Sequence, residues 1–120
     1  MKNINIITAN LINSNGNPAA NQIVTRIYDK DELMTLNIKV FTSYDKKICM
    51  IDYTGDEITI AIDSKAFDYS ITTSKYLNIF LEENDINPKD IKKIYNLGYG
   101  AKITTKYNMI FKVIILDLNN

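Results

Sequence analysis

Two carboxylates, Asp63 and Asp68, are the strongest candidates for a catalytic or metal-binding role in this sequence. Both fall where a predicted strand crosses over to a predicted helix, and there they could hold a divalent cation or act as an acid and base pair. The chain contains no histidine, so the commonest general base and the Ser-His-Asp and Cys-His arrangements are missing. We therefore favour a structural role, in which Asp63 ends the strand and Asp68 anchors the start of the helix.

The single cysteine, Cys49, lies between Ile48 and Met50 in an apolar run. It has no second cysteine with which to form an intramolecular disulfide or a thiolate zinc site, and no histidine to activate it. We expect a buried, unreactive thiol. The sequence thus predicts no catalytic residue, no metal site and no cofactor, and a protein that is not an enzyme.

Acidic residues and tyrosines gather instead in the predicted turns, where they could contact a partner. Tyrosine is enriched in protein interfaces, although it can also stack on nucleic-acid bases. Acidic turns could imitate phosphates toward a basic nucleic-acid channel. The predicted partner-binding residues are Asp29, Asp31, Glu32, Tyr44, Asp45, Tyr53, Asp56 and Glu57.

Length and composition are those of one globular domain over residues 1–120, with 46% hydrophobic and 23% charged residues. Fourteen basic residues balance fourteen acidic ones, so no bulk attraction to nucleic acid or acidic membranes follows. The N-terminus lacks the long apolar run of a signal peptide, and no window is long enough to span a membrane. We expect a cytoplasmic protein.

The elements that position these residues begin with short strands joined by polar turns, a pattern typical of an antiparallel meander. Strands are predicted at 3–9, 23–28, 33–41, 48–53 and 57–63, with an exposed loop at 13–20 and turns at 29–32, 44–47 and 54–56. Within 33–41, one face carries Leu36, Ile38 and Val40, and the other carries Thr35, Asn37 and Lys39.

Two helices follow. The first is predicted over about 72–84, because Ser70, Thr72 or Thr73 can cap its start and Leu77, Phe80 and Leu81 recur at helical spacing on its buried face. The second has Asn87 as N-cap, Pro88 at its first position, Asp90 in its first turn and Gly98 as a left-handed cap. Its buried face would carry Ile91, Ile94 and Tyr95.

The last segment, 107–118, is a strand whose later half is apolar on both faces, which places it inside the sheet. The glycines of 97–101 mark a turn, because the lysine and hydroxyl of a phosphate-binding loop are missing. The sequence therefore predicts an α+β domain in which an antiparallel sheet of about five or six strands carries two helices on one face.

The segment 41–81 contains Phe41-Thr42-Ser43-Tyr44, Ile48 and Ile51, then Phe67-Asp68-Tyr69-Ser70 with Thr72-Thr73. This pattern resembles small phage and plasmid proteins of low-GC Gram-positive bacteria. Those proteins carry a Phe-x-Ser-Tyr strand, an Ile-rich strand and a Trp-Asp-Tyr-Ser-x-Thr-Thr helix start, so Phe67 stands where tryptophan is usual. The resemblance implies a mobile-element context, in which small non-enzymatic proteins are often inhibitors of host defence, including anti-CRISPR proteins.

Our first hypothesis is thus a protein encoded by a phage or mobile element that binds and blocks a bacterial defence complex, such as a CRISPR-Cas effector. The alternative is a small accessory nucleic-acid-binding protein, using Arg26, Lys39, Lys46, Lys47, Lys75, Lys102 and Lys106. The apolar final strand could also join two copies as a homodimer if it lay at a sheet edge.

Overall fold

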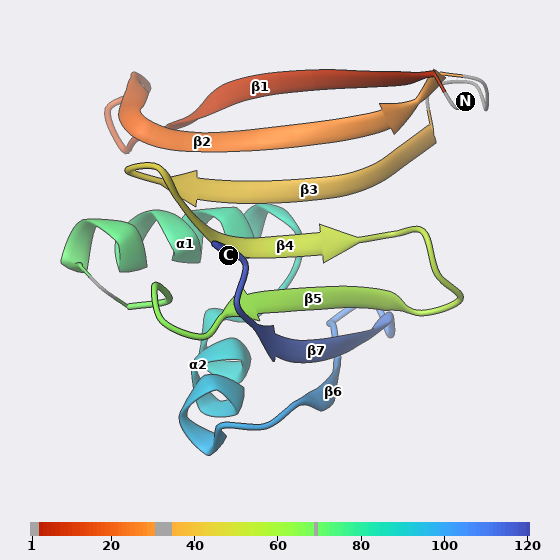
Figure 1. Cartoon of the computed structure of the whole chain (residues 1–120). Coiled ribbons are helices and arrows are strands. Elements are labelled where there is room, and N and C mark those ends of the chain that lie inside the picture. Colours follow the sequence, from red (N-terminus) through yellow and green to blue (C-terminus); the bar gives the residue numbers. More distant parts are fainter. Residues whose placement is uncertain (1–2, 31–34, 69) are drawn as a thin grey trace.

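A twisted sheet carries most of the chain, and two helices follow its fifth strand (Figure 1). The structure is a computed structural model and describes residues 3–30, 35–68 and 70–120. Its strands are β1 (Ile4–Ile12), β2 (Pro18–Asp29), β3 (Thr35–Ser43), β4 (Lys46–Asp52), β5 (Ile58–Asp63), β6 (Ala101–Thr104) and β7 (Ile110–Leu116). Its helices are α1 (Ile71–Glu83) and α2 (Pro88–Leu97).

The strand order β1-β2-β3-β4-β5-β7-β6 gives seven strands over the described residues, more than the five or six predicted. All neighbours are antiparallel except β5 and β7. The connection between these two strands contains both helices and β6, and β7 turns back from β6 to run in the direction of β5. The strand that the sequence does not predict is β6. It has only four residues, and it follows Gly100, where a Cβ would lie 2.6 Å from the Val113 carbonyl oxygen.

The β1–β2 connection is shorter than the predicted loop at 13–20. The side-chain oxygen of Asn13 accepts hydrogen bonds from the backbone N–H groups of Asn15 and Asn17, and Gly16 supplies a φ of +80°. These two features close a tight turn over 13–17, so residues from Pro18 onward already pair with β1. Residues 18–20 were therefore wrongly predicted as loop.

Both helices have the ends that the sequence predicts. Ser70 caps α1 by accepting from the Thr73 N–H, and α1 begins one residue before the predicted position. Asn87 caps α2, Pro88 is its first residue and Gly98 ends it with a φ of +80°. The predicted buried residues Leu77, Phe80, Leu81, Ile91 and Ile94 are buried, whereas Tyr95 is half-buried.

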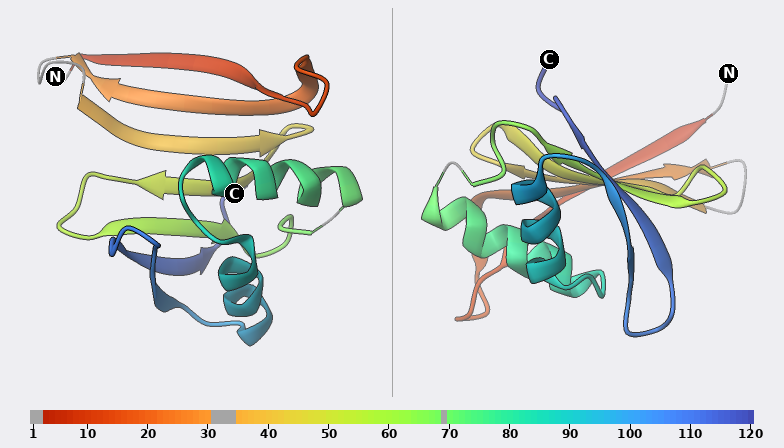
Figure 2. Two further views of the ribbon diagram at one scale, coloured as in Figure 1. Left: turned by 180° about the vertical axis from the view of Figure 1, so that it is seen from behind. Right: turned by 90° about the horizontal axis from the view of Figure 1, so that it is seen from below.

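The helices lie on one side of the sheet in both views of Figure 2. Helix α1 runs along β3, where the rings of Phe41 and Phe80 stack with their centroids 5.7 Å apart. On the other side of the sheet no helix of the described residues is seen (Figures 1 and 2). The main core thus lies between β2–β5, β7 and the two helices.

Strand β7 lies between β5 and β6, so the prediction that the final strand is interior is confirmed. The sheet edges are β1 and β6 instead. We expected the final strand to join two copies only if it lay at a sheet edge, and β7 does not. Within the described residues, neither helix is long and apolar enough to cross a membrane.

Candidate functional site

The face of the sheet opposite the helices is identified by strand register. Phe41 points toward α1, and residues paired across neighbouring strands share a face while successive residues alternate. Val40 pairs with Thr25 and with Met50, so these three lie on the opposite side. We call this side the open face, and its central residues are Ile23, Thr25 and Ile27 of β2, Ile38, Val40 and Thr42 of β3, Met50 of β4 and Ile114 of β7.

The centre of the open face is apolar and uncharged. All its central side chains are half-buried, because large residues on neighbouring strands shield one another although no helix covers them. Charged residues stand around it, with Lys47 and Asp52 at the two ends of β4 and Lys102 and Lys112 on β6 and β7. An apolar centre with a polar rim is the composition of a protein interface.

The alternation predicted for 33–41 places its apolar row on this open face. Leu36, Ile38 and Val40 face away from the helices, while Lys39 faces α1, where its Nζ donates to Asn84 Oδ1. In an ordinary half-buried strand the apolar residues face the core and the polar residues face water. In β3 the residues Leu36, Ile38 and Val40 instead face away from the helices. Lys39 of its polar row contacts the helix, and no helix of the described residues covers its apolar row.

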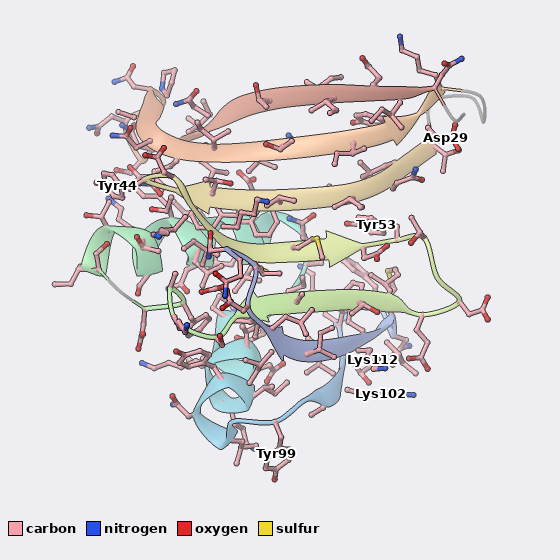
Figure 3. All side chains as sticks on the ribbon, in the orientation of Figure 1. Asp29, Tyr44, Tyr53, Tyr99, Lys102 and Lys112 are labelled. Carbon is pink, nitrogen blue, oxygen red and sulfur yellow. The ribbon has the colours of Figure 1, made fainter. Side chains whose placement is uncertain are left out.

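The predicted partner-binding residues divide between two ends of the sheet (Figure 3). Tyr44 and Asp45 form the β3–β4 turn, with φ of 49° and 73°, and Tyr44 is 45% exposed. Asp29 and Tyr53 lie at the other end, with the β4–β5 turn that carries Asp56 and Glu57. Asp31 and Glu32 lie outside the described residues. The structure therefore does not bring the eight predicted residues into one patch.

Asp29 and Tyr53 are less exposed than residues of a solvated turn. Asp29 is the last residue of β2 and is 2% exposed, so it belongs to the strand rather than to the predicted turn at 29–32. Tyr53 is half-buried, its N–H donates to the Asn37 carbonyl, and the Lys39 ammonium lies 5.9 Å from its ring centroid. Burial raises the pKa of the Tyr53 hydroxyl above its usual value.

The carboxylate of Glu57 forms an ion pair with a lysine. Its Oε1 lies 2.9 Å from Lys102 Nζ, and this hydrogen bond lowers the pKa of the Glu57 carboxyl. Lys102 is paired in register with Lys112 across the β6–β7 ladder. Glu57 thus sits beside two lysines, which offset its charge and weaken it as an imitation of a phosphate.

Asp63 is a structural acid. One carboxylate oxygen accepts from the N–H groups of Lys65 and Ala66, and the other accepts from the N–H of Leu118 at 2.7 Å. Burial acts to raise the pKa of Asp63, but these hydrogen bonds outweigh it and lower the pKa below its usual value. The carboxylate therefore ties the end of β5 to the C-terminal segment, as the structural role required.

Asp68 is exposed and does not share a cluster with Asp63 that could bind a metal ion. Within the described residues, no group of three or more Cys, Asp or Glu side chains could hold one. Cys49 is fully buried, and burial raises the pKa of its thiol to about 12. The thiol is therefore protonated at neutral pH, as expected for an unreactive cysteine.

The sequence did not reveal one pair of neighbouring cations. Arg26 and Lys39 are paired directly across β2 and β3, where like charges repel. Burial and the charge of Arg26 lower the pKa of the Lys39 ammonium, while Glu83 acts to raise it. Both residues were assigned to the nucleic-acid alternative, but only strand register reveals that they are neighbours. The other cations of that alternative come from separate parts of the fold, including Lys46 at the start of β4 and Lys75 on α1.

A family model described as a family of unknown function (DUF8033) matches residues 7–96, which is three quarters of the chain. The matched part includes β1 from Ile7 onward, β2–β5 and both helices except the last residue of α2, and it ends before β6 and β7. The searches of curated proteins and of solved structures found no match.

Proposed function

We propose that this chain, which belongs to the family of unknown function DUF8033, works by binding a protein partner through the open face of its sheet rather than by catalysis. The observation that carries the proposal is the uncharged, mainly apolar centre of that face. It runs over β2, β3 and β4 and reaches Ile114 of β7 across the small, fully buried Ala61 of β5, with charges only around it. Monomeric proteins rarely leave a continuous apolar surface of this kind without a use for it.

The chemistry of the open face favours protein over nucleic acid. Nucleic-acid binding depends on cations that neutralise phosphates along the whole contact, and here the lysines stand at the rim, as Lys47 and Lys112 do. An apolar protein surface would instead remove Ile38, Val40 and Met50 from water. Because these side chains are already half-buried, each would contribute about half of the roughly 1.5–3 kcal/mol that full burial of an exposed side chain supplies. Part of that gain is offset by the cost of association.

Within this class we propose the partner implied by the resemblance to phage and plasmid proteins. That partner is a bacterial defence nuclease complex, such as a CRISPR-Cas effector, blocked by steric occlusion in the cytoplasm of the host cell. The exposed side chain of Tyr44, at one end of the sheet, would serve as an anchor beside the apolar contact.

The test is capture of effector complexes by tagged protein from a low-GC Gram-positive lysate, with and without nuclease treatment. Recovery of a defence nuclease after nuclease treatment is the expected result. A second assay would measure whether purified chain inhibits target cleavage by that nuclease. Recovery of DNA or RNA alone would overturn the proposal in favour of nucleic-acid binding.

Two lysine substitutions locate the contact. Thr25→Lys places a charge at the centre of the open face, opposite Val40, and should reduce capture about tenfold or more because an unpaired charge in an apolar interface costs several kcal/mol. Leu97→Lys is the matched control. Leu97 is 49% exposed at the end of α2, where a cation is favourable. Equal capture by both variants, with both folded by circular dichroism, would place the contact elsewhere.

A further inference from the structure

The sheet edge formed by β1 has the features of a strand that pairs with another chain. Its nine residues, Ile4–Ile12, include no charged residue and no proline, although lysine and proline are the usual means of blocking an edge. Four of its isoleucines are exposed, with Ile4 at 53%, Ile6 at 55%, Ile7 at 44% and Ile12 at 49%. The opposite edge is different, because β6 has only four residues and carries Lys102.

The direction of the backbone groups along β1 follows from one hydrogen bond and the register. The Lys30 N–H donates to the Asn3 carbonyl at 3.0 Å, and β1 pairs with β2 in unbroken antiparallel register from Ile4 to Asn10. In such a ladder alternate residues bond to the neighbouring strand. Asn5, Ile7 and Ala9 therefore bond to β2, and the groups that point outward along this edge are those of Ile4, Ile6, Thr8 and Asn10.

We propose that two copies of this chain form a homodimer by antiparallel pairing of β1 with β1 of the second copy. The register that uses all four outward-pointing residues sets Ile4 opposite Asn10 of the second copy and Ile6 opposite Thr8. The two-fold axis then passes beside Ile7. This register forms about eight backbone hydrogen bonds, because each outward residue offers one donor and one acceptor.

The side chain of Ile7 is placed to fill the contact at the axis. Ile7 occupies a position between the outward-bonding residues, where facing side chains come closest, with Cα atoms about 4.5 Å apart. It lies on the helix side of the sheet, in register with Arg26, yet it is 44% exposed. Pairing would bury each Ile7 against its counterpart.

The surface area of the chain is consistent with an uncovered interface. The accessible surface is 7411 Å², whereas a folded monomer of 13.7 kDa exposes about 6,600 Å². The chain thus exposes about 800 Å² more than an average monomer of its mass, as fits a sheet with one uncovered face and one uncovered edge.

A two-fold axis perpendicular to the sheet keeps both open faces on the same side. The dimer would thus present one continuous sheet, with its helices behind it and a doubled open face in front. This inference goes beyond the proposed function and is independent of it, because a dimer would form whether or not a defence complex binds the open face.

Disulfide trapping tests the register. Ile7→Cys should form an intermolecular disulfide in mild oxidant, since the facing Cα separation of about 4.5 Å lies within the range of disulfides. Ile6→Cys is the matched control. Ile6 is more exposed than Ile7, but in this register its nearest counterpart is Thr8 rather than Ile6. Cys49 is fully buried and gives little background. Equal trapping of both variants, or trapping of Ile6→Cys alone, would overturn the register.

Analytical ultracentrifugation tests the dimer itself. We expect the wild-type chain to sediment at twice 13.7 kDa at micromolar concentration, and Ile7→Lys to sediment as a monomer because it places two ammonium groups against each other at the axis. Thr8→Pro is the second variant, since it removes only an outward N–H and should raise the dimer dissociation constant about tenfold or more. A wild-type monomer, or folded variants that remain fully dimeric, would overturn the proposal.

Discussion

The hydroxyl oxygens of Ser43 and Thr73 lie 2.9 Å apart in a fully buried position. This hydrogen bond joins the end of β3 to the first turn of α1. Farther along the same pair of elements, Phe41 stacks on Phe80 and Lys39 donates to Asn84. Three contacts in antiparallel order thus dock α1 against one face of β3. They fix which face of β3 the helix covers, so that Lys39, Phe41 and Ser43 face α1 while Ile38 and Val40 lie on the open face.

Replacing Thr73 tests this contact. Thr73→Val keeps the shape of the side chain but removes the hydrogen bonds to Ser43 and to Ser70. We expect the free energy of unfolding in urea to fall by about 1–3 kcal/mol, the usual cost of losing buried hydrogen bonds. Thr72→Val is the control, because Thr72 lies on the exposed side of the same turn and should change stability by about 0.5 kcal/mol or less. Equal effects would show that the contact contributes nothing specific.

The carboxylate of Asp63 makes the stability of the fold depend on pH. Its hydrogen bonds lower its pKa in the folded state below that of the unfolded chain. The stabilisation is therefore complete at pH values above the pKa of an aspartate in the unfolded chain, about 3.9. It is lost as the pH falls through the lower pKa that Asp63 has in the folded protein.

Asp63→Asn should cost about 2–3 kcal/mol of unfolding free energy at neutral pH, since it weakens hydrogen bonds made to a charged group. The difference between the wild type and this variant should shrink steadily below about pH 4. Urea titrations across this range measure both quantities. The exposed Asp68→Asn serves as the control. If the difference in unfolding free energy between the wild type and Asp63→Asn does not change with pH, Asp63 is not the titrating group.

The thiol of Cys49 should be unreactive until the protein unfolds. Burial raises its pKa to about 12, so at pH 8 only a trace of the reactive thiolate is present, and the thiol is also inaccessible. Reaction with a chromogenic disulfide reagent should be slow in native buffer and complete at once in concentrated guanidinium chloride. Rapid labelling of the folded protein would mean that β4 opens readily.

Much of the fold could be predicted because its signals are local. Asn87, Pro88 and Gly98 define the ends of α2 through capping chemistry that needs no distant contact, and the helical spacing of Leu77, Phe80 and Leu81 identifies the buried face of α1. What failed depended on pairing between distant segments. The parallel contact of β5 with β7, the short strand β6 and the opposition of Arg26 and Lys39 all follow from register.

Sequence alone could not show how the predicted partner-binding residues are arranged, for the same reason. Turn residues such as Tyr44 and Asp56 were chosen because turns are exposed, and the sequence could not show that they fall at opposite ends of the sheet. The alternation of Leu36, Ile38 and Val40 was visible, but alternation does not reveal which face a helix will cover. That choice is made by residues elsewhere, including Phe80 and Thr73, so the open face emerges only from the assembled sheet.

Gln22 offers a last test, because it is fully buried and its side-chain amide has no hydrogen-bond partner among the described residues. It lies beside Ser43 in the β2–β3 register, on the side of the sheet that α1 covers. Burying an unpaired amide costs about 1–3 kcal/mol. Gln22→Met keeps the length of the side chain and removes the polar atoms, so the variant should be more stable by about 1 kcal/mol or more in urea.

Val24→Met is the matched control, since Val24 is equally buried two residues along the same strand. The larger side chain should destabilise the core there by about 1–3 kcal/mol, because it adds volume to a filled site. A stability gain at residue 22 together with a loss at residue 24 would trace the effect to the unpaired amide. If Gln22→Met instead lowers stability, the amide makes a hydrogen bond in solution, and the most direct donor or acceptor would be a water molecule enclosed beside Ser43 and Thr73.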